Sequence, residues 1–296
     1  MIYILRAAKE VIATAVDIIL PASLSRFFLP TIDHYAPHSP DVGFEGWYTR
    51  IQDEDLSMAI VFCSLGNGTL GPRKHYVHFS ASAIGTTALD PPIELHQFPE
   101  HIISTHTSLS SFTLEAPGIG TFSCTPDLQT YTLEIPEPAT DSVLLVTIHI
   151  MKRTPLDETD LYRTPHGKMA RMETTLPLHW HVFSTCSQAA YDVRRRTSGQ
   201  RDNVLLQGIG RAHLEKNWGN SFPQGWTWSQ ASSRAKSPDP TCMVLAGGRI
   251  LGQKAFLVHY RSPTLNWMFP RHTLSHRSFL LYSASICVPL LPRSGN

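Results

Sequence analysis

Alternation of apolar and polar residues along short segments is the feature that most constrains the fold of this chain. A period of two places every second side chain on one face of a β-strand. Such segments recur within residues 40–150 and 175–262, and the 22 Pro and 18 Gly of the chain supply turns between them. We therefore predict an antiparallel all-β protein with two blocks of strands. The expected strands include residues 58–63, 76–81, 112–115, 130–135 and 143–150.

The two ends of the chain do not follow this pattern. We predict a short N-terminal helical segment over residues 1–35, because Asp17 interrupts an apolar run that is too short to span a bilayer. This amphipathic segment would pack on the body, and docking on a membrane surface is the alternative. Residues 263–296 lack periodicity, and we expect an irregular tail or an artefact of the gene model. The β domain then comprises residues 36–262.

Composition narrows the class of protein. The net charge of +1 over 296 residues lacks the excess of positive charge that is typical of nucleic-acid-binding proteins. The short basic run Arg194-Arg195-Arg196 is predicted to be a solvated strand end. The five Cys are irregularly spaced and form no C-x-x-C pair, which is typical of reduced thiols in an intracellular protein. No clear signal peptide is seen, so we expect a cytoplasmic or membrane-associated location. The oligomeric state is left open.

Tryptophan clusters in a few motifs that also carry ionisable or amide groups. Five of the six Trp fall in F-E-G-W-Y (residues 44–48), H-W-H (179–181), E-K-N-W-G (215–219) and W-T-W (226–228). If these segments are strands, Glu45 shares a face with Trp47, and Glu215 shares a face with Asn217. His179 and His181 likewise share a face, opposite Trp180. If these faces line one cavity, it holds both carboxyls, Asn217 and at least one imidazole, walled by indoles.

Such a cavity favours acid chemistry on an apolar substrate. Burial disfavours the charged form of a carboxyl, which can then stay protonated and act as a general acid. Glu45 and Glu215 are the candidate acids, while His179 or His181 would orient or deprotonate a nucleophile. Indole faces stabilise a nearby cation. The predicted substrate-binding residues are Trp47, Tyr48, Asn217, Trp218, Trp226 and Trp228.

Each of these residues also has a structural interpretation. Glu215 and Lys216 could form a buried or a surface ion pair with each other, Gly46 could mark a β-bulge, and a His-x-His pair on a strand is commonly structural. A zinc site at His179 and His181 would need a third ligand that we cannot place, so no metal is predicted.

At these motifs the sequence resembles the tocopherol cyclase family. The resemblance rests on residues 44–48, 215–219, Phe222-Pro223 and 226–228, with support from residues 178–181 and 246–248, and spans about residues 40–262. It implies a lipocalin-like barrel or sandwich around an apolar cavity. It also implies closure of a prenylated hydroquinone to a chromanol by alkene protonation, without cofactor or metal. The chain lacks the long insertions of the plant enzymes between the motifs.

Three roles remain open at this point: an isomerase, a carrier of a hydrophobic ligand, and a stress-related structural relative in which the motifs hold the sheets together without a cavity. Lipocalin-like relatives also include carotenoid hydratases and pericyclases of secondary metabolism, and the fold does not decide among their reactions. A non-catalytic carrier of a hydrophobic ligand is the alternative to an isomerase. Carboxyls that point into an apolar pocket favour an enzyme, whereas ion pairs of Glu45 or Glu215 with Lys216 or Arg211 favour a carrier. In either case the expected partner is a small hydrophobic, prenylated molecule.

Overall fold

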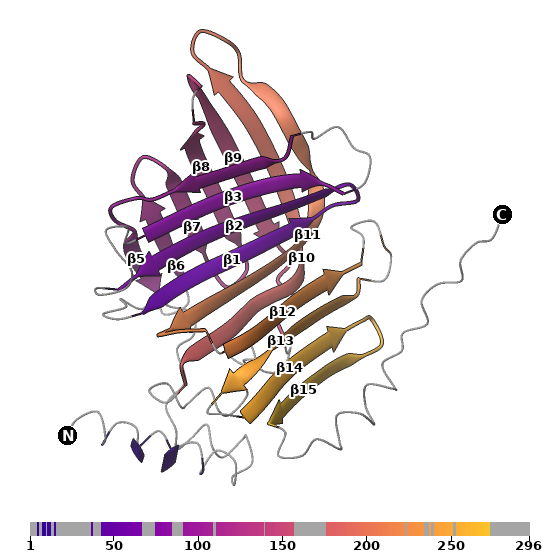
Figure 1. Ribbon diagram of the computed structural model, residues 1–296. Coiled ribbons are helices and arrows are strands. Elements are labelled where there is room, and N and C mark those ends of the chain that lie inside the picture. The colour runs from indigo at the N-terminus through magenta and orange to yellow at the C-terminus, as the bar shows by residue number, and fades with distance from the viewer. Residues whose placement is uncertain are drawn as a thin grey trace, which may run out of the picture.

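The chain folds into two antiparallel β-sheets (Figure 1). The computed structural model describes residues 43–66, 75–84, 91–108, 111–138, 140–156, 176–222, 224–233, 240–250 and 253–272, with scattered single positions elsewhere. The large sheet has 11 strands in the order β4-β3-β2-β1-β11-β10-β9-β8-β7-β6-β5. The small sheet has four strands in the order β12-β13-β14-β15. The all-β prediction is therefore confirmed.

The strands of the large sheet are β1 (Phe44–Gln52), β2 (Leu56–Leu65), β3 (His75–Ala83), β4 (Ile93–Gln97), β5 (Ile103–Ser108), β6 (Ser111–Ala116), β7 (Gly120–Cys124), β8 (Gln129–Pro136), β9 (Ser142–Met151), β10 (Leu178–Thr197) and β11 (Asn203–Gly219). Those of the small sheet are β12 (Gln224–Ser232), β13 (Cys242–Ile250), β14 (Gln253–Arg261) and β15 (Asn266–His272).

The large sheet curls into a half-barrel, so that β1–β3 lie across from β6–β9 (Figure 1). Alternate residues of these strands point inward and form one buried apolar cluster. Trp47 packs on Phe112 with ring centroids 5.7 Å apart, and the hydroxyls of Thr49 and Tyr131 are 2.6 Å apart. The inside of the half-barrel is thus filled by side chains, including Phe62, Phe79, Phe122 and Tyr131.

Strands β10 and β11 extend beyond the half-barrel. Residues 188–197 of β10 pair with β9, whereas residues 178–187 pair with β11 alone. Beyond the end of β9, Trp180 and Val182 pack against Val244 and Ala246 of the small sheet. The β10–β11 pair therefore belongs to the half-barrel at one end and packs against the small sheet at the other.

The predicted division into blocks needs correction. The expected strands at residues 58–63, 76–81, 112–115, 130–135 and 143–150 all form. However, β10 and β11 belong to the first sheet, and the second sheet begins only at β12. One strand, β15, lies within the segment that we expected to be irregular.

Some predictions fall on parts of the chain that are not described. Of the predicted N-terminal helix only scattered positions between residues 5 and 15 are described, so the helix is not supported, and most of residues 263–296 lie outside the described residues. The described residues include no helix with the length and apolar character that a membrane crossing requires. Cys63, Cys124, Cys186 and Cys242 are free thiols, and Cys287 is not described.

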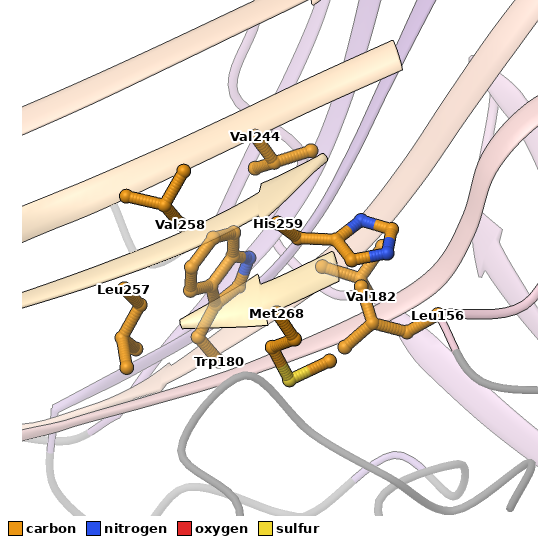
Figure 2. Close-up of a pocket in the computed structure, with 8 residues that line it drawn as sticks. All are labelled: Leu156, Trp180, Val182, Val244, Leu257, Val258, His259 and Met268. Atoms are coloured by element: carbon orange, nitrogen blue, oxygen red, sulfur yellow. The ribbon is translucent and has the colours of Figure 1, made fainter. Parts of the chain in front are cut away.

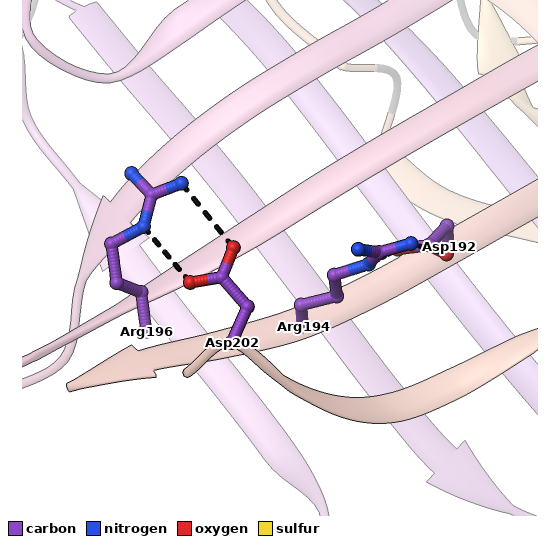
Figure 3. Close-up of polar contacts among 4 residues, drawn as sticks. All are labelled: Asp192, Arg194, Arg196 and Asp202. Carbon is purple, nitrogen blue, oxygen red and sulfur yellow. Dashed lines mark hydrogen bonds and ion pairs between the residues drawn. The ribbon is translucent and has the colours of Figure 1, made fainter. Parts of the chain in front are cut away.

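The basic run at the end of β10 is neutralised by neighbouring carboxylates. Arg194 Nε lies 2.6 Å from Asp192, and Arg196 Nε lies 3.1 Å from Asp202 (Figure 3). Arg195 forms a two-bonded pair with Glu137, at 2.7 and 2.8 Å. All three guanidinium groups thus have an acidic partner. This agrees with the prediction that the run is a solvated strand end.

Candidate functional site

An aromatic cleft lies on the outer face of the large sheet, beside β12. Tyr48 of β1 is paired with Glu215 of β11, and Gly46 is paired with Asn217. Residues directly opposite each other in an antiparallel pair point to the same face, so these four share the outer face. The cleft has a volume of about 350 Å³. It is lined by Phe44, Gly46, Trp47, Tyr48, Val61, Cys63, Glu215, Asn217, Phe222, Trp226 and Trp228.

Aromatic contacts build the cleft walls from both sheets. Phe44 stacks on Phe222 with centroids 5.0 Å apart, and Phe222 lies 5.9 Å from Trp226. Tyr48 meets Trp228 edge to face at 5.2 Å. Because β1 belongs to the large sheet and β12 to the small one, the cleft exists only where the two sheets meet.

Among the described residues that line this cleft, Glu215 is the only carboxylic acid. Its side chain is buried and surrounded by nitrogen groups. Trp180 Nε1–H donates to Oε2 at 2.9 Å, and Asn217 Nδ2–H donates to Oε1 at 2.9 Å. His213 Nε2 lies 2.9 Å from Oε2. These contacts hold the carboxyl in one orientation at the edge of the apolar space.

His213 is the functional candidate that the sequence motifs do not include. Its Nδ1 has no hydrogen-bond partner among the described residues, which places the proton of a neutral ring on Nε2, toward Glu215. The result is a buried imidazole–carboxyl pair. The sequence pattern could have identified His213, because His213, Glu215 and Asn217 are alternate residues of one strand and therefore share a face.

Two further groups of the cleft are kept neutral at ordinary pH. Burial raises the pKa of Tyr48 to about 12, and the charge of Glu215 adds to the effect. Burial also raises the pKa of Cys63 to about 12. The phenol of Tyr48 is therefore available as a neutral hydrogen-bonding group. The indole N–H of Trp228 has no acceptor in the part of the chain that the structure describes. Trp47 is among the lining residues, but its indole lies on the inward face against Phe112 and Lys216.

Glu45 lies on the opposite face of the sheet and forms a buried ion pair. Lys216 Nζ is 2.6 Å from Glu45 Oε1, and both side chains are almost completely buried. The ammonium group also lies over the rings of Trp47 and Trp218, at 5.3 and 4.7 Å from their centroids. This arrangement compensates both charges and leaves Glu45 outside the cleft, as expected of a carrier, so that Glu215 alone remains as a candidate acid.

The two predicted histidines lie on that same inward face. His179 stacks on Trp218 at 5.2 Å, and His181 meets Phe183 edge to face at 4.7 Å. Both are buried, and their β11 partners are Trp218 and Lys216. The alternation within each motif is therefore as predicted. The expectation of one cavity that holds both carboxyls is wrong, because Glu45, His179, His181 and Trp218 lie across the sheet from Glu215.

The two glycines of the motifs have different roles. Strand β1 pairs without a bulge on either side, so Gly46 does not mark one. A Cβ at Gly46 would lie 3.6 Å from Cys63 Sγ, which is an ordinary contact. Because glycine has no side chain, the cleft is deeper at this position. Gly219 has φ +148°, and a Cβ there would lie 2.3 Å from the Pro177 carbonyl oxygen. Gly219 is thus required by the backbone.

A second void between the sheets is too small for an organic ligand. Figure 2 shows Val182, Leu257 and Met268 around the indole of Trp180. The space among these side chains is about 10 Å³, which is room for at most one water. Because this part of the interface is packed, the cleft at Glu215 is the better ligand site.

Comparisons with known proteins show the fold and no family. The chain matches no family model and no curated protein. It is similar to CghA in complex with Sch210972, with a TM-score of 0.50 at 10% identity. That match covers 78% of this chain but 66% of CghA, slightly less than two thirds of its length.

Two other solved structures have lower scores. An AttH-like protein from Nitrosomonas europaea gives a TM-score of 0.45 at 14% identity, covering 82% of this chain and 75% of that protein. Kievitone hydratase from Nectria haematococca gives 0.41 at 9% identity, with 82% and 68% covered. The likeness to CghA supports the lipocalin-like architecture implied by the motifs, and the resemblance to tocopherol cyclases stays a prediction.

Proposed function

We propose that this chain is a cyclase- or hydratase-type enzyme of the lipocalin-like fold, acting on an apolar substrate with an alkene near an oxygen nucleophile. In its narrower form, the proposal is closure of a prenylated hydroquinone to a chromanol-type ring. The observation that carries it is Glu215, a carboxyl held by Trp180, His213 and Asn217 at the edge of an aromatic cleft.

In the proposed reaction the Glu215–His213 pair takes up one proton in addition to the Nε2 proton of the neutral imidazole. Glu215 transfers this proton to one alkene carbon, and the π electrons form the new C–H bond. The adjacent carbon becomes cationic, and the faces of Trp226 and Trp228 stabilise it. A lone pair of the substrate's phenol oxygen then forms the C–O bond, and the phenol proton returns to Glu215. If water attacks instead, the product is a hydrate.

The apolar walls would protect the cation from bulk water until the internal nucleophile reacts. Phe44, Phe222 and Trp226 provide a surface for a prenyl chain. Tyr48, neutral and beside Glu215, provides a hydrogen bond for the oxygen of the head group. In this proposal His213 takes the role that we had expected of His179 or His181.

The decisive variant is Glu215→Gln, which keeps the shape of the side chain but cannot donate the proton. We expect turnover to fall by about 10²–10⁴-fold, the usual contribution of a positioned acid or base. Purified protein is incubated with a panel of prenylated hydroquinones and polyenes, and products are separated by chromatography with mass detection. Retention time is needed because cyclisation leaves the mass unchanged.

A matched control is Glu134→Gln, which changes an exposed glutamate of β8. It should retain full activity. Full activity of Glu215→Gln, with a circular dichroism spectrum like that of the wild type, would reject the proton-transfer role.

A carrier function is distinguished by Gly46→Leu, which fills the cleft floor without backbone strain. We expect this variant to lose at least about 1.4 kcal/mol of ligand binding, a factor of ten in Kd. If the wild type binds a hydrophobic probe in the cleft, loses it in Gly46→Leu, and converts no substrate of the panel, the protein is a carrier.

A further inference from the structure

A second cluster of chemically active side chains lies away from the cleft, on the outer face of β3 and β4. His78 and His96 are directly opposite each other in this strand pair, and Glu94 follows the same face of β4. His78 is three strands from Glu215 along one cross-strand row, about 14 Å at 4.8 Å per strand. The proposed reaction does not use this cluster.

The spacing of the two imidazoles fits coordination of one ion. Nδ1 of His78 lies 3.3 Å from Nδ1 of His96. Two nitrogen ligands at 2.0–2.1 Å from a tetrahedral Zn²⁺ are about 3.3–3.4 Å apart. Oε1 of Glu94 lies 3.2 Å from Nε2 of His96, and one ligand atom from each of the three residues falls within 4.8 Å of the others. The rigid strand pair therefore already supplies the two nitrogens at ligand separation.

We propose that His78, His96 and Glu94 form a binding site for a divalent transition metal, with Zn²⁺ as the reference ion. The two imidazoles supply nitrogen, and Glu94 supplies oxygen. The Glu94 side chain is 65% exposed, so it is free to rotate toward the ion. Two nitrogens and one carboxylate favour Zn²⁺ or Cu²⁺ over Mg²⁺ and Ca²⁺, which prefer oxygen ligands alone.

Neighbouring aromatic rings hold the imidazoles in place. Tyr76 lies 6.0 Å from His78 and 5.9 Å from His96 between ring centroids, nearly parallel to both. The Tyr76 hydroxyl is 2.7 Å from Nδ1 of His96, a hydrogen bond that an ion bound at Nδ1 would replace, and Phe98 packs on Tyr76 with ring centroids 5.4 Å apart. This stack limits ring rotation, which lowers the entropic cost of metal binding.

The ion would connect β4 to its neighbour. β4 has only five residues and is the edge strand of the large sheet. It is attached to the body through β3 on one side, and an edge strand exposes unpaired backbone groups. A metal bridge between His78 and His96 would therefore protect the β3–β4 pairing from local opening.

The test is calorimetric titration of untagged, full-length protein with Zn²⁺. We expect one site in the wild type, and weakening of at least about tenfold in His78→Ala, in His96→Ala and in Glu94→Gln. His149→Ala removes an exposed histidine of β9 and should leave the affinity unchanged. Equal affinity in wild type and in the His78→Ala/His96→Ala double variant, or no binding at millimolar Zn²⁺, would overturn the proposal.

A second readout does not depend on variants. Hydrogen exchange of the wild type should show slower exchange in β3 and β4 on addition of Zn²⁺, with β6–β9 unchanged. Uniform protection across the large sheet, or none in β4, would show that the ion binds elsewhere. Mg²⁺ at the same concentration should have no effect on β4.

Discussion

Lys216 shows how a charged residue within a motif can serve packing instead of chemistry. Its side chain is completely buried, paired with Glu45 and placed between the indoles of Trp47 and Trp218. Burial of a charge is costly unless its partner and hydrogen bonds are in place. The pair therefore fixes the register of β1 against β11, which in turn sets Tyr48 opposite Glu215.

Replacing Lys216 alone should destabilise the fold strongly. In Lys216→Met the carboxylate of Glu45 is left buried without its partner, and the expected loss is about 3–5 kcal/mol. Urea unfolding followed by tryptophan fluorescence measures it. The double variant Glu45→Gln/Lys216→Met should recover part of the loss, because no charge remains buried. A single variant as stable as the wild type would contradict the structural role.

The motifs predicted which residues share a face, but not what each face meets. Glu45 with Trp47, and His179 with His181, alternate as strand geometry requires. Whether a face points into the half-barrel or toward the small sheet depends on pairings between strands far apart in sequence. Such pairings leave no local signal, so both carboxyls were assigned to one cavity.

At the scale of elements, β10 explains why the block structure was predicted incorrectly. Residues 178–187 are all buried, since one face meets the half-barrel core and the other meets the small sheet. A strand that is covered on both faces lacks the alternation of apolar and polar residues, so its length cannot be predicted from that pattern. The shorter strands β8 and β9, with one buried face each, were predicted correctly.

A pH-dependent ion pair connects the β8–β9 hairpin to the end of β10. Hydrogen bonds from Arg195 hold the pKa of Glu137 below its ordinary value. A lowered folded-state pKa means that the pair adds stability above the unfolded pKa, and that this stability is lost as the pH falls through the folded pKa. The contribution is therefore present at neutral pH and absent in strong acid.

We expect Glu137→Gln to lower the free energy of unfolding by about 0.5–1 kcal/mol at pH 7, toward the upper end for a surface pair because the geometry is bidentate. The difference from wild type should shrink as the pH drops below the ordinary range of a glutamate. Chemical unfolding at a series of pH values measures this. A difference that stays constant, or grows, toward acid pH would contradict it.

For the whole molecule, the cleft depends on contact between two sheets with separate cores. The floor and one wall come from β1, β2 and β11, while Trp226 and Trp228 come from β12. The large sheet has its own apolar cluster inside the half-barrel, and the small sheet packs through a smaller cluster around Trp180. Loosening the smaller cluster should therefore open the cleft before it unfolds the half-barrel.

Leu156→Ala tests this dependence. Leu156 is almost completely buried with Trp180, Val182 and Val244, and its truncation should cost about 2–5 kcal/mol through lost burial and a new cavity. Hydrogen exchange should become faster in β12–β15 and stay unchanged in β6–β9, and ligand binding in the cleft should weaken. Val204→Ala, at an exposed position of β11, should change neither. Equal acceleration in both sheets would mean that they unfold as one unit, and that the cleft is as stable as the half-barrel itself.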